Sequence, residues 1–133
     1  MVSGVAAVIL LDTHVVVWLY ADPQRHIPSA VAQRLDTEEL GLSPFVQLEL
    51  AYLHEVGRIA VTAQAILDEL CPKLEMVLTD PSSALICESA TRLSWTRDPF
   101  DRLIAAQAIV TATPLVTKDR TIRQHLDLAW WQD

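Results

Sequence analysis

The chain has 133 residues, ten basic and 17 acidic side chains, a net charge of −7 and an apolar fraction of 51%. This length fits a single domain over residues 1–133, and the apolar content excludes a disordered chain. Two cysteines and the lack of a basic leader segment predict a reduced protein of the cytoplasm rather than a secreted, disulfide-bonded one.

The N-terminal third begins with an apolar run that predicts a buried strand over residues 7–11. The longer apolar stretch over residues 1–20 is a poor membrane span, because Asp12 near its middle would cost about 2.5–3.5 kcal/mol on insertion. A short helix over 15–20, a loop over 22–28 and a helix over 29–36 are expected next. We therefore expect no membrane partner.

The central third predicts a strand over 40–42 and a helix over 44–55 that starts at a Ser-Pro pair. A second helix over 62–70 should be closed by Pro72. The alternating apolar residues that follow favour a strand over 74–78.

The C-terminal third predicts helices over 81–93 and 99–111, a strand over 115–117, a helix after residue 119 and an edge strand over 129–131. Strands and helices thus alternate, and no internal repeat or linker interrupts them. The expected fold is α/β, a small parallel β-sheet flanked by helices on both faces in an α/β/α sandwich. Ligands of such folds bind beyond the carboxyl ends of the strands.

Two aspartates follow predicted strands. Asp12 comes directly after the first strand, and Asp119 comes two residues after the strand over 115–117. Each could simply cap the helix that follows, which is a common role of aspartate. Both should nevertheless lie at the same edge of the sheet.

Glu49 lies within the apolar stripe of the helix over 44–55, four residues after Phe45 and four before Leu53. A carboxylate that faces the interior is costly unless it is paired or bound to a cation. A buried arginine partner and a metal ion are both open at this point.

Asp98 and Asp101 surround a proline at the start of the helix over 99–111. Asp98 suits the N-cap, and Asp101 is placed to reach back to the cap backbone as in a capping box. The same geometry points Asp101 toward the sheet edge that carries Asp12. The two roles are compatible.

Four carboxylates at this edge would repel one another. At separations of about 4–6 Å the cost is about 1 kcal/mol per pair in water, rising to about 4 kcal/mol at an effective dielectric constant near 20. A divalent cation would relieve this repulsion, and all-oxygen ligation suits Mg²⁺ or Mn²⁺. The histidines and cysteines lack zinc-ligand spacing.

Basic residues gather near the last two acidic motifs. Residues 92–123 have a net charge of +3, so the remainder of the chain is −10. This excess could contact a nucleic-acid backbone or could be a chance cluster on a solvated face.

Four stretches, ILLDTHVVVWL, SPFVQLELA, RDPFDRLIAAQA and LVTKDR, resemble the acidic motifs of PIN-domain ribonucleases, and more narrowly those of the VapC toxins of type II toxin–antitoxin systems. The resemblance runs from Val8 to about Arg120. It departs at the glutamate motif, where relatives often carry a serine and an aromatic residue and this chain has Val46 or Gln47 and Leu48.

The resemblance implies Mg²⁺- or Mn²⁺-dependent hydrolysis of phosphodiester bonds in structured RNA. It also implies a homodimer that a VapB-type antitoxin holds inactive. The implied residues fall into four groups: catalytic and metal-binding Asp12, Glu49, Asp101 and Asp119; a further metal-binding residue, Asp98; supporting Thr13, Ser43 and Thr117; and candidate RNA contacts Arg97, Arg102, Lys118 and Arg120.

Other classes of protein fit less well. A haloacid-dehalogenase-like phosphatase needs a second aspartate where this chain has His14, and a phosphoacceptor receiver domain needs paired acids beside the first strand. A catalytically silent binding module on the same fold remains the main alternative.

Overall fold

A computed structural model describes residues 8–133 and shows one five-stranded parallel sheet in the order β3-β2-β1-β4-β5. The strands are β1 (Val8–Leu11), β2 (Glu39–Leu42), β3 (Val77–Leu78), β4 (Leu115–Val116) and β5 (Ala129–Trp130). The predicted first strand is confirmed from residue 8 onward, and its residue 7 lies outside the described part of the chain. The predicted edge strand near residue 129 is also confirmed.

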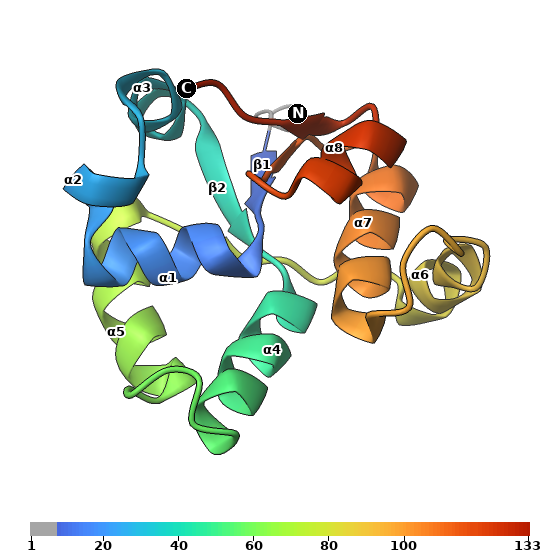
Figure 1. Cartoon of the computed structure of the whole chain (residues 1–133), viewed down its shortest axis with the longest axis horizontal. Helices are drawn as coiled ribbons and strands as arrows, with labels where there is room; N and C mark the ends of the chain where they lie inside the picture. The colour runs from blue at the N-terminus through green and yellow to red at the C-terminus, as the bar shows by residue number, and fades with distance from the viewer. Residues whose placement is uncertain (1–7) are drawn as a thin grey trace.

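Helices cover both sides of this sheet. In Figure 1 the helices α1 to α5 lie on the left and below the central strands, and α6 to α8 lie on the right. The helices are α1 (Thr13–Ala21), α2 (Pro23–His26), α3 (Ser29–Thr37), α4 (Pro44–Glu55), α5 (Ala63–Leu74), α6 (Ser83–Ala90), α7 (Pro99–Thr111) and α8 (Arg120–His125). The expected α/β/α arrangement is therefore confirmed.

The core forms between the sheet and these helices. Central strand β1 buries Ile9, Leu10 and Leu11 almost completely, as expected for a parallel strand covered on both faces. On α7 the small residues Ala105 and Ala108 are fully buried in the same core cluster as these strand residues.

Two helix starts match the sequence prediction. Helix α4 begins at Pro44, after Ser43 accepts a hydrogen bond from the Phe45 N–H at 3.1 Å. Helix α7 begins at Pro99 with Asp98 as its N-cap. Both helices place acidic residues near the carboxyl edge of the sheet.

The prediction around Pro72 was wrong. Helix α5 continues through Pro72 to Leu74 and ends at Glu75, whose φ of 52° is left-handed, so strand β3 is only two residues long. Leu67, Leu70 and Leu74 recur at helical spacing, and this buried face extends the helix beyond the proline. Pro72 removes the one hydrogen bond that an N–H at its position would have donated to the Asp68 carbonyl, and packing of the buried face outweighs this loss.

The expected loop over 22–28 also contains a short helix. Asp22 accepts a hydrogen bond from the Arg25 N–H at 3.3 Å, and Pro23 occupies the first position of α2.

No helix within residues 8–133 is long and apolar enough to cross a bilayer.

Candidate functional site

A pocket of about 290 Å³ opens at the carboxyl edge of the sheet. It lies where the chain leaves β1, whose two neighbours β2 and β4 are reached through helices on opposite sides of the sheet. Ligands of open α/β sheets bind at such a switch point. The lining residues are Asp12, Thr13, His14, Val17, Trp18, Glu49, Leu53, Arg58, Ile59, Asp101 and Asp119.

Asp12 is held by the two strand ends beside it. The residue is only 3% exposed, and its Oδ1 accepts a hydrogen bond from the Thr13 N–H at 2.8 Å. Its Oδ2 accepts one from the Thr117 hydroxyl at 2.7 Å. Both oxygens therefore have fixed directions, and Asp12 caps α1 while it lines the pocket.

His14 lies beside Asp12 in the first turn of α1. Its Nε2 accepts a hydrogen bond from the Lys118 N–H at 3.1 Å, and its Nδ1 lies 3.5 Å from Asp12 Oδ2. The ring nitrogen that faces Asp12 is therefore Nδ1, and Nε2 faces the Lys118 backbone. Sequence reasoning did not place His14 in the site.

Glu49 projects from α4 into the same pocket. Its Oε1 accepts a hydrogen bond from the Thr13 hydroxyl at 2.5 Å. Burial raises the pKa of Glu49; the Thr13 hydrogen bond opposes this rise, and the charges of Asp12 and Asp98 add to it. The arginine partner left open from the sequence is not found, since none of the ion pairs within residues 8–133 includes Glu49.

Asp98 is a helix cap at the edge of the site and does not line the pocket. Its Oδ1 accepts hydrogen bonds from the Phe100 N–H at 2.8 Å and the Asp101 N–H at 3.0 Å. Its own N–H donates to the Thr96 hydroxyl at 3.2 Å. The expected capping box is therefore wrong in one half, because Thr96 takes the role expected of Asp101.

Asp101 is consequently left to the pocket. No group within residues 8–133 donates a hydrogen bond to its carboxylate. Burial raises the pKa of Asp101 to about 7, and the charges of Asp98, Asp12, Asp119 and Glu49 contribute in that order. Burial and the neighbouring carboxylates therefore both disfavour the charged form of Asp101.

Asp119 combines the two roles expected from the sequence. It caps α8 by accepting a hydrogen bond from the Ile122 N–H at 2.9 Å, and it lines the pocket. Its own N–H donates to the Thr117 hydroxyl at 3.1 Å, so Thr117 joins Asp119 to Asp12. Ser43 is fully buried and caps α4 rather than lining the pocket.

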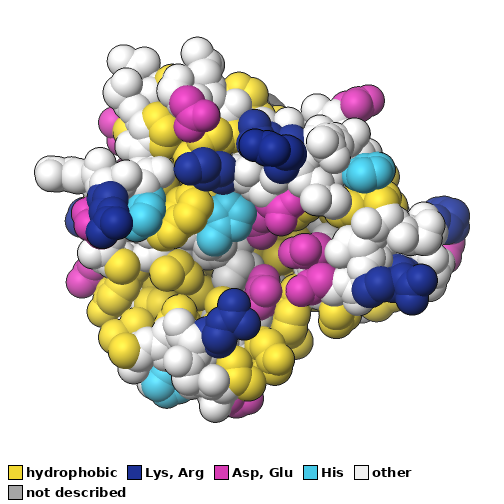
Figure 2. All heavy atoms as spheres, viewed as in Figure 1, with side chains coloured by type: hydrophobic (Ala, Val, Ile, Leu, Met, Phe, Trp, Pro, Cys, Tyr) yellow, Lys and Arg dark blue, Asp and Glu magenta, His cyan; other side chains and the backbone are white. Residues whose placement is uncertain are grey.

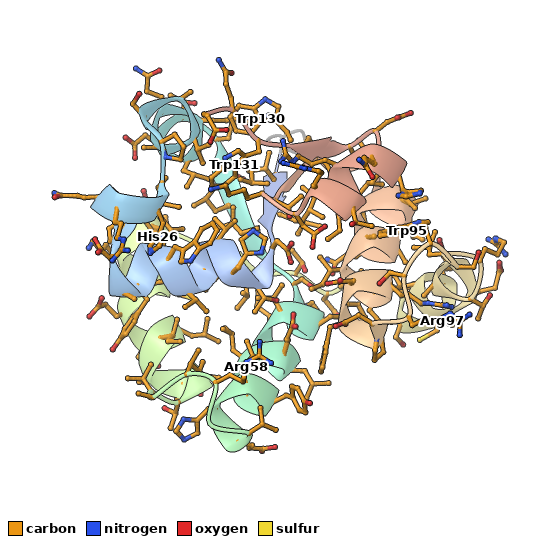
Figure 3. All side chains as sticks on the ribbon, in the orientation of Figure 1. His26, Arg58, Trp95, Arg97, Trp130 and Trp131 are labelled. Carbon is orange, nitrogen blue, oxygen red and sulfur yellow. The ribbon has the colours of Figure 1, made fainter. Side chains whose placement is uncertain are left out.

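The four basic residues expected to contact RNA lie outside the pocket lining. The Arg102 side chain donates from Nε to the Thr96 carbonyl at 2.8 Å, and Lys118 Nζ lies 5.9 Å from the centre of the Trp18 ring. Figure 3 shows Arg97 beside α6, away from the centre of the face. The basic residue that does line the pocket is Arg58, which no sequence motif indicated.

The donor set fits a hard divalent cation in its chemistry, since the four acidic lining residues offer only oxygen. Figure 2 shows acidic side chains gathered in the middle of this face. Within residues 8–133, however, no three acidic, histidine or cysteine side chains are grouped closely enough to hold one ion between them. Mg²⁺ commonly uses one or two carboxylates and keeps several waters, so the arrangement remains compatible with it.

Comparisons with known proteins agree with this geometry. The sequence matches the PIN domain over residues 9–125. The chain therefore belongs to the PIN-domain family. It is 39% identical over 120 residues to Ribonuclease VapC22 of Mycobacterium tuberculosis (strain ATCC 25618 / H37Rv), covering 88% of this chain and 91% of that protein. This likeness places the chain among the VapC-type members of the family.

Solved structures share the fold at lower identity. VapBC2 from Rickettsia felis, bound to a DNA fragment from its promoter, matches 88% of this chain and 92% of its own with a TM-score of 0.66 and 20% identity. VapBC-1 from nontypeable Haemophilus influenzae matches 95% of this chain and 97% of its own with a TM-score of 0.65 and 18% identity.

Proposed function

We propose that the protein is a metal-dependent endoribonuclease and the toxin of a toxin–antitoxin pair. The observation that carries this proposal is the convergence of Asp12, Glu49, Asp101 and Asp119 on one pocket at the switch point of a PIN-domain sheet. The similarity to a protein named as a VapC ribonuclease supports the same activity.

In this proposal Mg²⁺ or Mn²⁺ would be bound among Asp12, Glu49, Asp101 and Asp119, by some of them directly and by others through retained waters, with Asp98 acting mainly through its charge. A bound cation would make a water more acidic and would balance the negative charge that develops on the leaving oxygen. Asp12 presents its oxygens in directions fixed by Thr13 and Thr117. Glu49 and Asp101 adjust to the cation, because fewer hydrogen bonds hold them.

The substrate in this proposal is structured RNA. Lys118 and Arg120 flank Asp119 in the sequence and are exposed, so they are placed to contact the RNA backbone. Arg97 and Arg102 are proposed contacts farther from the carboxylates. Because these contacts are ionic, RNA binding should weaken as salt concentration rises.

The proposed partners are a VapB-type antitoxin and a second copy of the chain in a homodimer. Related structures contain VapBC complexes, which supports the first partner. On α4, Leu48 and Tyr52 are 58% and 48% exposed one turn apart, and the Tyr52 ring lies 5.7 Å from that of Phe100. This apolar surface is a suitable place for a second copy. We further propose that the whole chain forms one domain and works in the cytoplasm.

The test is cleavage of total cellular RNA by purified, antitoxin-free protein, with the cut ends mapped by sequencing. Parallel reactions contain Mg²⁺, Mn²⁺ or EDTA, and Asp12→Asn serves as the inactive control. We expect discrete cuts that require both the metal ion and Asp12. Cuts that persist in EDTA or in Asp12→Asn would come from a contaminant or from different chemistry.

One observation favours a second candidate, a catalytically silent binding module. The acidic side chains within residues 8–133 are not grouped as a three-ligand cation site. Titration with Mn²⁺ by calorimetry separates the two candidates. A folded protein that takes up no Mn²⁺ and cuts no RNA would be the binding module.

A further inference from the structure

The turn between α4 and α5 carries an arginine at a fixed place on the pocket rim. Gly57 begins this turn with a φ of 78°, a left-handed conformation that favours glycine. The Arg58 N–H then donates to the Leu53 carbonyl at 2.8 Å, and the Ile59 N–H donates to the same oxygen at 3.3 Å. These bonds fix the backbone of Arg58 and leave its side chain to the pocket.

Arg58 is the one lysine or arginine among the residues that line the acidic pocket. It is exposed, and the ion pairs formed within residues 8–133 do not include it. In Figure 3 its side chain lies in front of α4 and is directed toward the centre of the face. Figure 2 shows a basic group at this lower side of the central acidic cluster.

The pocket needs a positive group if it is to accept a phosphodiester. Four carboxylates line it, so one divalent cation would leave the lining acidic and the RNA backbone would still be repelled. A guanidinium offers a planar pair of N–H donors that matches two phosphate oxygens. Arg58 carries such donors, and within the described residues no carboxylate already uses them.

We propose that Arg58 forms a phosphate-binding subsite that takes the RNA backbone phosphate next to the bond being cut. The inference rests on the proposed ribonuclease function and names a contact for its substrate. Arg58 lies on the lower part of this face in Figure 3, and α8, which begins at Arg120, lies on the upper part in Figure 1, so the RNA backbone would be contacted from two parts of the face.

The experiment measures RNA binding apart from cleavage. All proteins carry Asp101→Asn so that the RNA stays intact, and Mg²⁺ is present throughout. The probe is a 5′-fluorescein-labelled RNA of random sequence, about 20 nucleotides long, followed by fluorescence anisotropy over a series of salt concentrations. Arg58→Ala, Arg58→Gln and Arg58→Lys are compared with Arg92→Ala, a matched control whose exposed arginine pairs with Glu88 on α6.

We expect Arg58→Ala and Arg58→Gln to weaken binding about 10-fold and to lower the slope of log Kd against log salt by about 0.7, as for the loss of one phosphate contact on single-stranded RNA. Arg58→Lys should keep most of the salt dependence and lose part of the affinity. Lysine retains the positive charge but lacks the planar pair of N–H donors of a guanidinium. Arg92→Ala should change neither quantity. In the cleavage-competent protein, Arg58→Gln should raise KM more than it lowers kcat.

Unchanged affinity and slope in both neutral variants would overturn the subsite, as would an equal loss in Arg92→Ala. Thermal melting checks the fold of each variant, and Arg58→Gln keeps the test available if the alanine variant unfolds. The two proposals fail separately. RNA cleavage without an Arg58 effect removes only the subsite, whereas Arg58-dependent binding by a protein that cuts no RNA removes only the ribonuclease.

Discussion

The two sides of the acidic pocket are built in different ways. On the strand side, Asp12 and Asp119 are tied to each other through the Thr117 hydroxyl, and each also caps a helix. On the helix side, Glu49 accepts one hydroxyl hydrogen bond. The Asp101 carboxylate accepts no hydrogen bond from residues 8–133.

Hydrogen bonding thus divides the four carboxylates into two pairs. Asp12 and Asp119 are held in fixed directions, whereas Glu49 and Asp101 are held loosely. Strand-end carboxylates have their directions set by the fold before any ligand arrives. On the helix side, burial and, after it, the charges of the neighbouring carboxylates disfavour ionisation, so the pKa of Asp101 rises to about 7 and that of Glu49 rises as well. A ligand of positive charge would therefore act mainly on the helix side.

The largest expected effect on RNA cleavage comes from removing the charge of Asp101, one of the two loosely held carboxylates. Asp101→Asn should lower RNA cleavage by about 1,000-fold or more while the protein stays folded, because the amide cannot balance a cation. Cleavage rates at saturating Mg²⁺, with circular dichroism for the fold, measure this. Asp36→Asn, which changes an exposed carboxylate outside the pocket, should cut at the normal rate. A fully active Asp101→Asn protein would remove Asp101 from the site.

A smaller effect on RNA cleavage is expected from removing the Thr117 hydroxyl, which helps to fix the direction of the Asp12 carboxylate. Thr117→Val keeps the shape of the side chain but removes the hydroxyl that donates to Asp12 Oδ2 and accepts from the Asp119 N–H. We expect unfolding free energy to fall by about 1–3 kcal/mol and cleavage to fall by about 10- to 100-fold. Urea unfolding and cleavage assays test this, with exposed Thr121→Val as the control. Normal activity in folded Thr117→Val would show that Asp12 needs no orientation.

The stability of the metal-free protein should depend on pH through Asp101. Its folded-state pKa of about 7 lies above the ordinary value of 3.8. The protonated form therefore stabilises the fold fully below about pH 4, and this contribution is lost as the pH rises through about 7. At about pH 8 in EDTA, Asp101→Asn should be more stable than the parent by about 1–2 kcal/mol, less than the full shift implies because the side chain is partly solvated.

Unfolding in urea at several pH values measures this difference. The two proteins should be nearly equally stable at about pH 4, where the parent carboxyl is protonated too. Adding Mg²⁺ at higher pH should stabilise the parent more than Asp101→Asn, because binding to the folded state adds stability by mass action. Parallel pH profiles would contradict the view that Asp101 bears the repulsion.

The smallest effect is expected at the rim. Asp98→Asn keeps a good N-cap for α7, so unfolding free energy should change by less than about 0.5 kcal/mol. Cleavage should fall only a few-fold, since Asp98 acts on Asp101 through its charge. Cleavage rates of Asp98→Asn and Asp101→Asn, measured side by side, test which aspartate matters more for activity. Complete inactivation of folded Asp98→Asn would contradict the lesser role expected for Asp98.

Local signals in the sequence were sufficient for much of the fold. The pairs Ser43-Pro44 and Asp98-Pro99 placed the starts of α4 and α7, because a capping side chain and a proline at the first position act within a few residues. The helix past Pro72 was missed, since its buried face outweighs the local effect of proline. The end of α5 is therefore set by tertiary packing rather than by the local sequence.

The site shows the same division. Asp12 and Asp119 could be placed because Asp12 directly follows one strand of a parallel sheet and Asp119 comes soon after another. Arg58 and His14 could not, since nothing within their own segments indicates which pocket their side chains reach. The exchange of Thr96 for Asp101 in capping was equally hidden, because both are polar groups within reach of the same N–H.

The hydrogen bond from Thr117 to Asp12 joins residues 105 positions apart. Strand β4, which brings Thr117 beside β1, follows helix α7 in the chain. Asp12, Glu49 and Asp101 are therefore all synthesised before Thr117, the residue whose hydroxyl orients the Asp12 carboxylate. Because the two ends of this contact are far apart in the sequence, closing the loop between them carries an entropic cost that must be met before the contact forms. A chain cut short before Thr117 would carry three acidic residues of the pocket and lack the hydrogen bond that orients the first of them.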